Sequence, residues 1–294
     1  MPDSRSHRGL HPQDAALFAP SWLPVLRTAT EEFSWLLSRG YAPLSSLKLV
    51  GDRHALRERQ RDLVLRASCT DEQRANRSAR RLMPPLPPDQ GTGAMEAVPA
   101  VAAGRQDTGI TPSASGQTSA ESDETTDAFA TSTTMADAPV YGADWFIDGF
   151  NLLITLEAAL GGGLVFRARD GALRDLASVH DTYRSVEETD DALLLAGETL
   201  AEFRPASVTW LFDAPVSNSG RIAQRVRALA ESRQWPWEVR LSKNPDQELM
   251  SLQHGIVVTT DSLILDHVRH GWFPLSEQII TRLPPGFLYL DFGA

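Results

Sequence analysis

The chain has 294 residues, of which 42% are hydrophobic, enough for two ordinary domains with buried cores. Its single cysteine, Cys69, excludes an intrachain disulfide and a cysteine-based zinc cluster, and it favours a reduced, cytoplasmic setting. No segment approaches the roughly 20 apolar residues that a membrane-spanning helix needs, so we expect no membrane partner.

The net charge of −10 is unevenly distributed along the chain. Residues 1–84 carry 14 Lys and Arg against 9 Asp and Glu, residues 85–144 carry 1 against 9, and residues 145–294 carry 13 against 20. An acidic C-terminal half repels a polyanion unless its carboxylates surround metal ions. The basic N-terminal part could supply the missing attraction.

The N-terminal part, bounded at 1–84, is predicted to be a small helical domain, because apolar residues recur at helical spacing through 13–80. Gly40 and Pro43 stop one helix before the next begins. The run 54–66 and its neighbour carry five arginines: Arg53, Arg57, Arg59, Arg61 and Arg66. They form either a solvated helix surface or a patch that faces nucleic acid.

Residues 85–143 are rich in Pro, Ser, Thr, Gly, Ala and acidic residues. Such a segment buries too little apolar surface to offset the entropy of ordering. We therefore expect a disordered acidic linker.

Residues 144–294 alternate short β-rich runs with helical stretches, which predicts an α/β domain with a mainly parallel sheet flanked by helices. The expected strands are 145–147, 208–212, 238–241, 256–259 and 287–290. The expected helices are 171–179, 190–202, 222–232 and 262–270.

Three of the expected strands end in an aspartate, namely Asp148, Asp213 and Asp261, and Asp246 follows another. Singly, such a residue is more often a turn residue or a helix cap. Together they should converge, because the carboxyl ends of parallel strands lie at one edge of the sheet. Oxygen ligands favour Mg²⁺ or Mn²⁺, and such a site suits hydrolysis of a phosphodiester.

Two other stretches have groups that suit contact with a phosphate. A turn after Asp213 offers hydroxyl, amide and guanidinium groups, although a capped turn explains it equally well. Its residues are Ser217, Asn218, Ser219 and Arg221. Arg169 and Arg174, after three glycines, predict a mobile loop that contacts substrate, although internal salt bridges would explain the same charges.

Asp148-Gly149-Phe150-Asn151, Leu211-Phe212-Asp213 and Thr259-Thr260-Asp261-Ser262 resemble the motifs of PIN-like and NYN ribonuclease domains. The resemblance implies that Asp148 is the first metal ligand and Asn151 its companion, with Asp213 and Asp261 as later ligands. Asp246 resembles the acidic residue that precedes the last such strand, with Glu248 as a helper. A further acid is expected between the first and middle strands, and three residues compete for that role: Glu157, Asp170 and Asp175.

Outside the linker, nearly the whole chain resembles the DUF434 family, in which a helical module precedes a PIN-like module labelled DUF5616. The matching stretches are 35–41, 47–53, 59–61, 147–157, 169–175, 215–221 and 261–266. We therefore predict a divalent-metal-dependent nuclease that acts on RNA rather than DNA.

One alternative is a catalytically weak PIN-like protein that binds RNA or regulates. A haloacid-dehalogenase-type phosphatase is disfavoured, because Phe150 stands where that family needs a second aspartate. The oligomeric state is open, a homodimer included.

Overall fold

The computed structural model describes residues 8–83, 140–177 and 183–293. The described residues all belong to one compact unit, which therefore contains both the helical N-terminal part and the α/β part. The predicted linker, 85–143, lies outside the described residues except for its last four.

The α/β part is built on a four-stranded parallel sheet with the strand order β5-β4-β1-β6. Its strands are β1 (Asp144–Asp148), β4 (Ser207–Asp213), β5 (Trp237–Ser242) and β6 (Ile256–Val258). The sequence predicts all four, because each is a β-rich run bounded by turn residues. Asp148 pairs with Leu211 of β4, and Asp213 pairs with Ser242 of β5, so both aspartates lie at the carboxyl ends of their strands.

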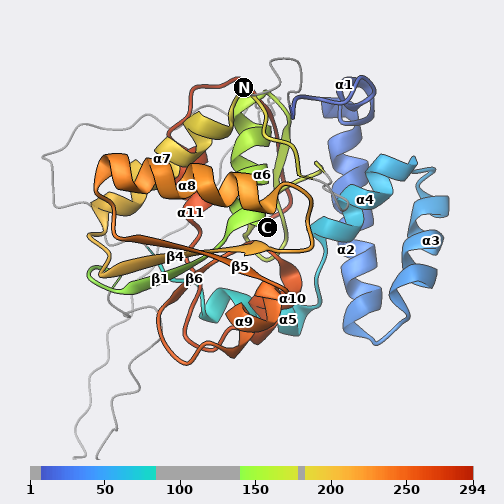
Figure 1. The fold of residues 1–294 in the computed structure, drawn as a ribbon. Coiled ribbons are helices and arrows are strands. Elements are labelled where there is room, and N and C mark those ends of the chain that lie inside the picture. The colour runs from blue at the N-terminus through green and yellow to red at the C-terminus, as the bar shows by residue number, and fades with distance from the viewer. Residues whose placement is uncertain (1–7, 84–139, 178–182, 294) are drawn as a thin grey trace, which may run out of the picture. The chain divides into compact units, whose positions relative to one another are not determined.

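Helices cover both faces of this sheet (Figure 1). One face carries α6 (Gly149–Leu160), α7 (Thr189–Glu202), α8 (Ser219–Arg233) and α11 (Leu275–Ile280). The other carries α9 (Pro245–Ser251) and α10 (Ser262–His267). Side chains alternate between the two cores, since Trp145 and Ile147 join the first and Phe146 packs against the second. The predictions of α7 and α8 are confirmed, whereas α10 ends three residues earlier than expected.

A second sheet has three strands in the order β3-β2-β7. They are β2 (Leu164–Arg167), β3 (Leu173–Asp175) and β7 (Leu288–Asp291). The predicted helix at 171–179 is wrong, because β3 occupies part of it and pairs antiparallel with β2. Gly171 closes this hairpin at a φ of 83°, a left-handed conformation that favours glycine. The last predicted strand exists, but as β7 it pairs with β2 rather than joining the main sheet.

The N-terminal part is helical, as predicted. It contains α1 (Asp14–Leu17), α2 (Leu23–Ser38), α3 (Pro43–Arg53), α4 (Glu58–Ala67) and α5 (Asp71–Ala79), with a 3₁₀ turn at Pro20–Trp22. Leu26 and Phe33 of α2 and Leu63 of α4 share one core with Phe166 of β2 and Leu290 of β7. The helices thus pack against the second sheet. Among the residues described, no helix combines the length and the apolar character needed to cross a membrane.

Candidate functional site

Asp148 is fixed at the sheet edge because β1 runs directly into α6. Its carboxylate caps that helix and accepts the Asn151 backbone N–H at 3.4 Å. The next residue, Gly149, packs so closely on the neighbouring strand that a Cβ there would lie 2.4 Å from the Phe212 ring. A larger residue at 149 would push the helix, and with it Asp148, away from β4.

The environment of Asp148 disfavours a bare negative charge. The residue keeps some solvent contact, but the surrounding protein raises the pKa of its carboxyl to about 7 through burial, helped by the negative charges of Asp246 and Asp261. The hydroxyl of Thr259 donates to Oδ2 at 2.8 Å and opposes this rise in pKa. At neutral pH the carboxyl is therefore poised between its two protonation states.

Asp213 and Asp246 belong to the same electrostatic group. Burial and then the charge of Asp246 raise the pKa of Asp213, and burial and then the charge of Asp261 raise the pKa of Asp246. Each of these four carboxylates (Asp148 included), which come from four separate elements, is thus repelled by at least one of the others at this end of the sheet. As they stand, no three His, Cys, Asp or Glu side chains in the described ranges are close enough to hold one metal ion.

Asn151 and Asp261 are both held by hydrogen bonds to backbone N–H groups. The Oδ1 atom of Asn151 accepts the backbone N–H of Thr260 at 2.8 Å and its hydroxyl at 3.0 Å, which ties α6 to the end of β6. Asp261 caps α10, because its Oδ1 accepts the backbone N–H groups of Leu263 at 2.8 Å and Ile264 at 3.2 Å. Asn151 thus links two elements and Asp261 caps a helix, whereas their expected roles at a metal site stay predictions.

A pocket of about 360 Å³ opens beside Asn151 and Asp261. It is lined by Arg66, Asn151, Arg174, Asp175, Thr260, Asp261 and Ser262. Arg66 comes from α4, so the helical part contributes to its wall.

Asp175 is the candidate acid that lines this pocket. Its Oδ2 accepts the Thr155 hydroxyl at 2.8 Å, while its buried Oδ1 has no hydrogen-bond partner within the described part of the chain. Burial raises the pKa of this carboxyl, although Thr155 and Arg66 oppose the rise. An unpartnered buried carboxylate oxygen is costly, and a ligand would relieve that cost.

The other two candidate acids have structural partners. Glu157 is buried in the far part of α6, where it accepts hydrogen bonds from the hydroxyls of Tyr183 and Thr189 and pairs with the partly exposed Arg8. Asp170 is also buried. Burial alone would raise its pKa, but its ion pairs with Arg174 and Arg77 outweigh that effect and hold the pKa at about 2.

Arg169 and Arg174 both bond within the chain. Arg174 donates to both oxygens of Asp170, at 2.9 and 2.7 Å, and its Nε–H donates to the Thr260 carbonyl at 2.8 Å. Arg169 donates to the Cys69 carbonyl at 3.1 Å and to Asp71 at 2.7 Å. These bonds match the internal salt bridges that the sequence leaves open as an alternative.

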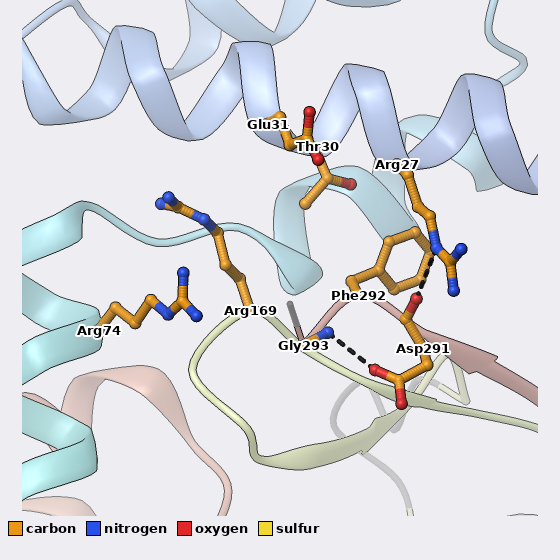
Figure 2. A pocket seen from close by; sticks show the side chains of 8 residues that line it. All are labelled: Arg27, Thr30, Glu31, Arg74, Arg169, Asp291, Phe292 and Gly293. Carbon is orange, nitrogen blue, oxygen red and sulfur yellow. Dashed lines mark hydrogen bonds between the residues drawn. The ribbon is translucent and has the colours of Figure 1, made fainter. Parts of the chain in front are cut away.

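Arg169 instead borders a different pocket, of about 590 Å³ (Figure 2). Arg74 and Arg169 lie on one side of it, and Arg27 donates to the Asp291 carbonyl on the other, at 3.1 Å. The lining of this pocket includes none of the four aspartates predicted to bind metal.

The turn after Asp213 is built largely by backbone contacts. Asn218 has a left-handed φ of 69° at the start of α8, and its side-chain amide donates to the Tyr183 carbonyl at 2.8 Å. Ser219 donates to the Ala214 carbonyl at 3.3 Å, whereas Ser217 and Arg221 are exposed. Asn218 therefore occupies the cap position of α8 without making a side-chain cap.

Of the five arginines at positions 53–66, three have ion-pair partners within the helical part, and one of them, Arg53, contacts Glu32 at 3.4 Å. Arg59 pairs with both oxygens of Asp14, at 2.6 and 2.8 Å, and Arg61 pairs with Asp52 at 2.7 Å. Arg57 is exposed at the start of α4. Sequence reasoning gave Thr259 no role of its own, although it stands in a recognisable motif. It named Asp175 only as one of three competing acids and Arg66 only as part of the arginine-rich stretch.

The fold and the site together define an α/β protein with several aspartates at the carboxyl edge of a parallel sheet. Residues 25–80 match the family "Protein of unknown function (DUF434)", and residues 138–278 match "Domain of unknown function (DUF5616)". The chain therefore combines a DUF434 domain with a DUF5616 domain, the arrangement that the resemblance implies.

A curated relative is an uncharacterized protein of Methanocaldococcus jannaschii, 36% identical over 140 residues. The match covers 47% of this chain and 66% of the relative, just under two thirds of its length. No solved structure matches the chain.

Proposed function

We propose that this chain is a divalent-metal-dependent nuclease that hydrolyses phosphodiester bonds, with RNA as its substrate. The observation that carries the proposal is the mutual repulsion of the four aspartates at the carboxyl edge of the sheet. Like charges in partly buried positions cost free energy unless a cation or a proton neutralises them. Mg²⁺ or Mn²⁺, which prefer oxygen ligands, would supply that neutralisation.

The oxygen chemistry of the residues present suits such an ion, and because no three acidic side chains of the described residues are close enough as they stand, the aspartates would have to move together around it. Asp148, Asp213, Asp246 and Asp261 would hold it, and it would polarise the phosphate and lower the pKa of a bound water. Thr259 would orient Asp148 through its hydrogen bond, and Asn151 would keep α6 against Thr260.

The choice of RNA rests on the resemblance of the aspartate motifs to PIN-like and NYN ribonucleases. The basic N-terminal part, with 14 Lys and Arg against 9 Asp and Glu, would attract the polyanion. A cytoplasmic setting belongs to the proposal too, because RNA and a reduced thiol such as Cys69 would occur together there.

The test uses the purified full-length chain with end-labelled single-stranded RNA, and with DNA of the same sequence, in Mg²⁺, Mn²⁺ or EDTA. We expect cleavage of RNA that needs the metal. Asp148→Asn and Asp213→Asn should each lower the rate of RNA cleavage by more than about a hundredfold. Loss of a residue that only supports a metal ligand costs up to about that much, and these two residues are the proposed ligands themselves.

Asp291→Asn is the matched control, since Asp291 also ends a strand but lies in the second sheet. RNA binding without cleavage in any metal would refute the nuclease and favour the catalytically weak RNA-binding protein. Cleavage that survives Asp148→Asn and Asp213→Asn would point to a contaminating nuclease.

A further inference from the structure

Arg66 places the helical N-terminal part at the edge of the aspartate group. It lies in the last turn of α4 and lines the pocket that also contains Asp261. Its NH1 group donates to the Asp175 carbonyl at 3.1 Å. In return, Arg174 donates to the Arg66 carbonyl at 3.4 Å and to the Thr260 carbonyl at 2.8 Å. These bonds fix Arg66 relative to the residue just before Asp261.

The two arginines of this pocket have different tasks. Arg174 is buried and binds both oxygens of Asp170, so its guanidinium group faces the interior of the chain. Arg66 is partly exposed, and its guanidinium group borders the pocket near Asp175 and Asp261. A guanidinium group matches the oxygens of a phosphate, which it can bind in a bidentate manner.

The chemistry of the walls selects the ligand. Asp175 and Asp261 would repel an anion on their own, but a cation held by the aspartates would turn that side of the pocket into an attractive one. Thr260 and Ser262 add hydroxyl groups. A volume of about 360 Å³ falls within the usual range of small-molecule sites and suits a phosphate with part of its nucleoside.

We propose that this pocket is a phosphate-binding subsite which the DUF434 and DUF5616 domains build together, with Arg66 as the residue that binds a backbone phosphate of RNA. The identity of the ligand rests on the proposed function. Arg66 is then a substrate-binding residue that the helical domain supplies to the site of the α/β domain.

The test measures binding of a short, fluorescently labelled single-stranded RNA to the full-length chain, in EDTA and in Ca²⁺, at several salt concentrations. Arg66→Ala should weaken binding about tenfold, as expected for a lost bond to a charged group. It should also reduce the slope of log K against log salt by about 0.7, the value for one phosphate contact on a single strand. Arg57→Ala, which removes an exposed arginine from the other end of α4, should leave both quantities unchanged.

Ser262 provides a second pair of variants that keeps the Arg66 bonds intact. Ser262→Asp adds a negative charge to the pocket, and Ser262→Asn adds a side chain of nearly the same size without charge. The aspartate should weaken RNA binding more than the asparagine does, and it should not destabilise the fold, because an acidic residue is favourable in the first turn of a helix.

The outcomes separate this inference from the proposed function. One outcome is that RNA binds while Arg66→Ala binds it like Arg57→Ala and Ser262→Asp binds it like Ser262→Asn. That result would reject the phosphate subsite and leave the proposed nuclease function untouched. Should Arg57→Ala lose as much as Arg66→Ala, the RNA lies over the helix surface rather than in the pocket. Binding with these effects but without metal-dependent cleavage would keep the subsite and reject the nuclease, and no binding at all would reject both.

Discussion

The hydroxyl oxygen of Thr259 donates to Oδ2 of Asp148 at 2.8 Å and accepts the backbone N–H of Asp261 at 3.1 Å. One side chain at the end of β6 therefore joins two aspartates that lie far apart in the sequence. Since Thr259 is buried, neither bond is easily replaced by water. The relative position of Asp148 and Asp261 depends on this hydroxyl group.

Thr259→Val should therefore damage the candidate metal site more than it damages the fold. Valine keeps the shape of threonine but removes the hydroxyl, so Asp148 loses a hydrogen bond that stabilises its charged form. We expect the affinity for Mn²⁺, measured by isothermal titration calorimetry, to fall by about 10- to 100-fold. This is the usual effect of removing a residue that hydrogen-bonds to a metal ligand. Thr259→Ser keeps the hydroxyl and should retain most of the affinity. Equal affinity in Thr259→Val and the wild type would contradict this role.

The ionised carboxylate of Asp148 should destabilise the metal-free protein at neutral and higher pH. Its pKa rises from 3.8 to about 7 on folding, so between these values the unfolded chain has released a proton that the folded chain retains. Stability therefore falls as the pH rises from about 4 to about 7, and it stays low above that. Asp148→Asn removes the charge and should raise the free energy of unfolding at pH 8 by at most about 4 kcal/mol, at 1.36 kcal/mol per pKa unit.

Urea denaturation without divalent cations, at acidic pH and at about pH 8, checks the Asp148→Asn prediction. The gain should be small near pH 4 and largest at the higher pH, and Asp291→Asn should show no such pattern. Mn²⁺ should stabilise the wild type and have little effect on Asp148→Asn. A variant that is no more stable than the wild type at pH 8 would show that Asp148 is not an unfavourable charge.

The strands of the main sheet could be predicted from the sequence because each is a local run of β-branched and aromatic residues. The hairpin of β2 and β3 could not. Leu173 is buried in the main core and Arg174 is buried beside Asp170. Both depend on contacts with residues distant in the sequence, so the local sequence pattern does not predict this strand. Helix α6 was missed because both of its faces are apolar, which hides the helical period, and because it starts immediately after Asp148.

The candidate site likewise contains residues that the sequence could predict and one that it could not. Strand-end aspartates could be found because the topology of a parallel sheet brings them to one edge. The additional acid could not be chosen by spacing, since Glu157, Asp170 and Asp175 all follow β1 at suitable distances in the sequence. Their contacts in the folded chain distinguish them. Glu157 pairs with Arg8 and Tyr183, Asp170 pairs with arginines, and Asp175 has one oxygen without a hydrogen-bond partner among the described residues.

Substitutions of the competing acids should separate their roles. Asp175→Asn should lower the affinity for Mn²⁺ or for RNA, because Asp175 lines the pocket beside Asp261. Glu157→Gln should leave both affinities unchanged but destabilise the fold by about 1–3 kcal/mol, since it weakens buried hydrogen bonds to Tyr183 and Thr189. Calorimetric titration and urea denaturation of the two variants give the comparison. The reverse pattern would move the additional acid from Asp175 to Glu157.

Arg77 should connect the stability of the protein to the geometry of its site. This buried residue of α5 pairs with Asp170 at 2.6 Å and, through two nitrogens, with Asp266 of α10 at 2.7 and 2.8 Å. Arg77→Met should cost about 3 kcal/mol of unfolding free energy, because it leaves a buried carboxylate with fewer partners. Arg282→Met, which breaks an exposed pair with Glu202, should cost less than about 1 kcal/mol.

The loss in Arg77→Met should also depend on pH. Asp170 has its pKa lowered from 3.8 to about 2, so its contribution, about 2 kcal/mol, is complete above pH 5 and disappears as the pH falls toward 2. Without Arg77 the pKa of Asp170 should rise, and stability should begin to fall at a higher pH than in the wild type. Urea denaturation between neutral pH and about pH 3 measures this shift. Since α10 begins directly after Asp261, Arg77→Met should also weaken Mn²⁺ binding, whereas unchanged binding would show that α10 is held at the site by other contacts.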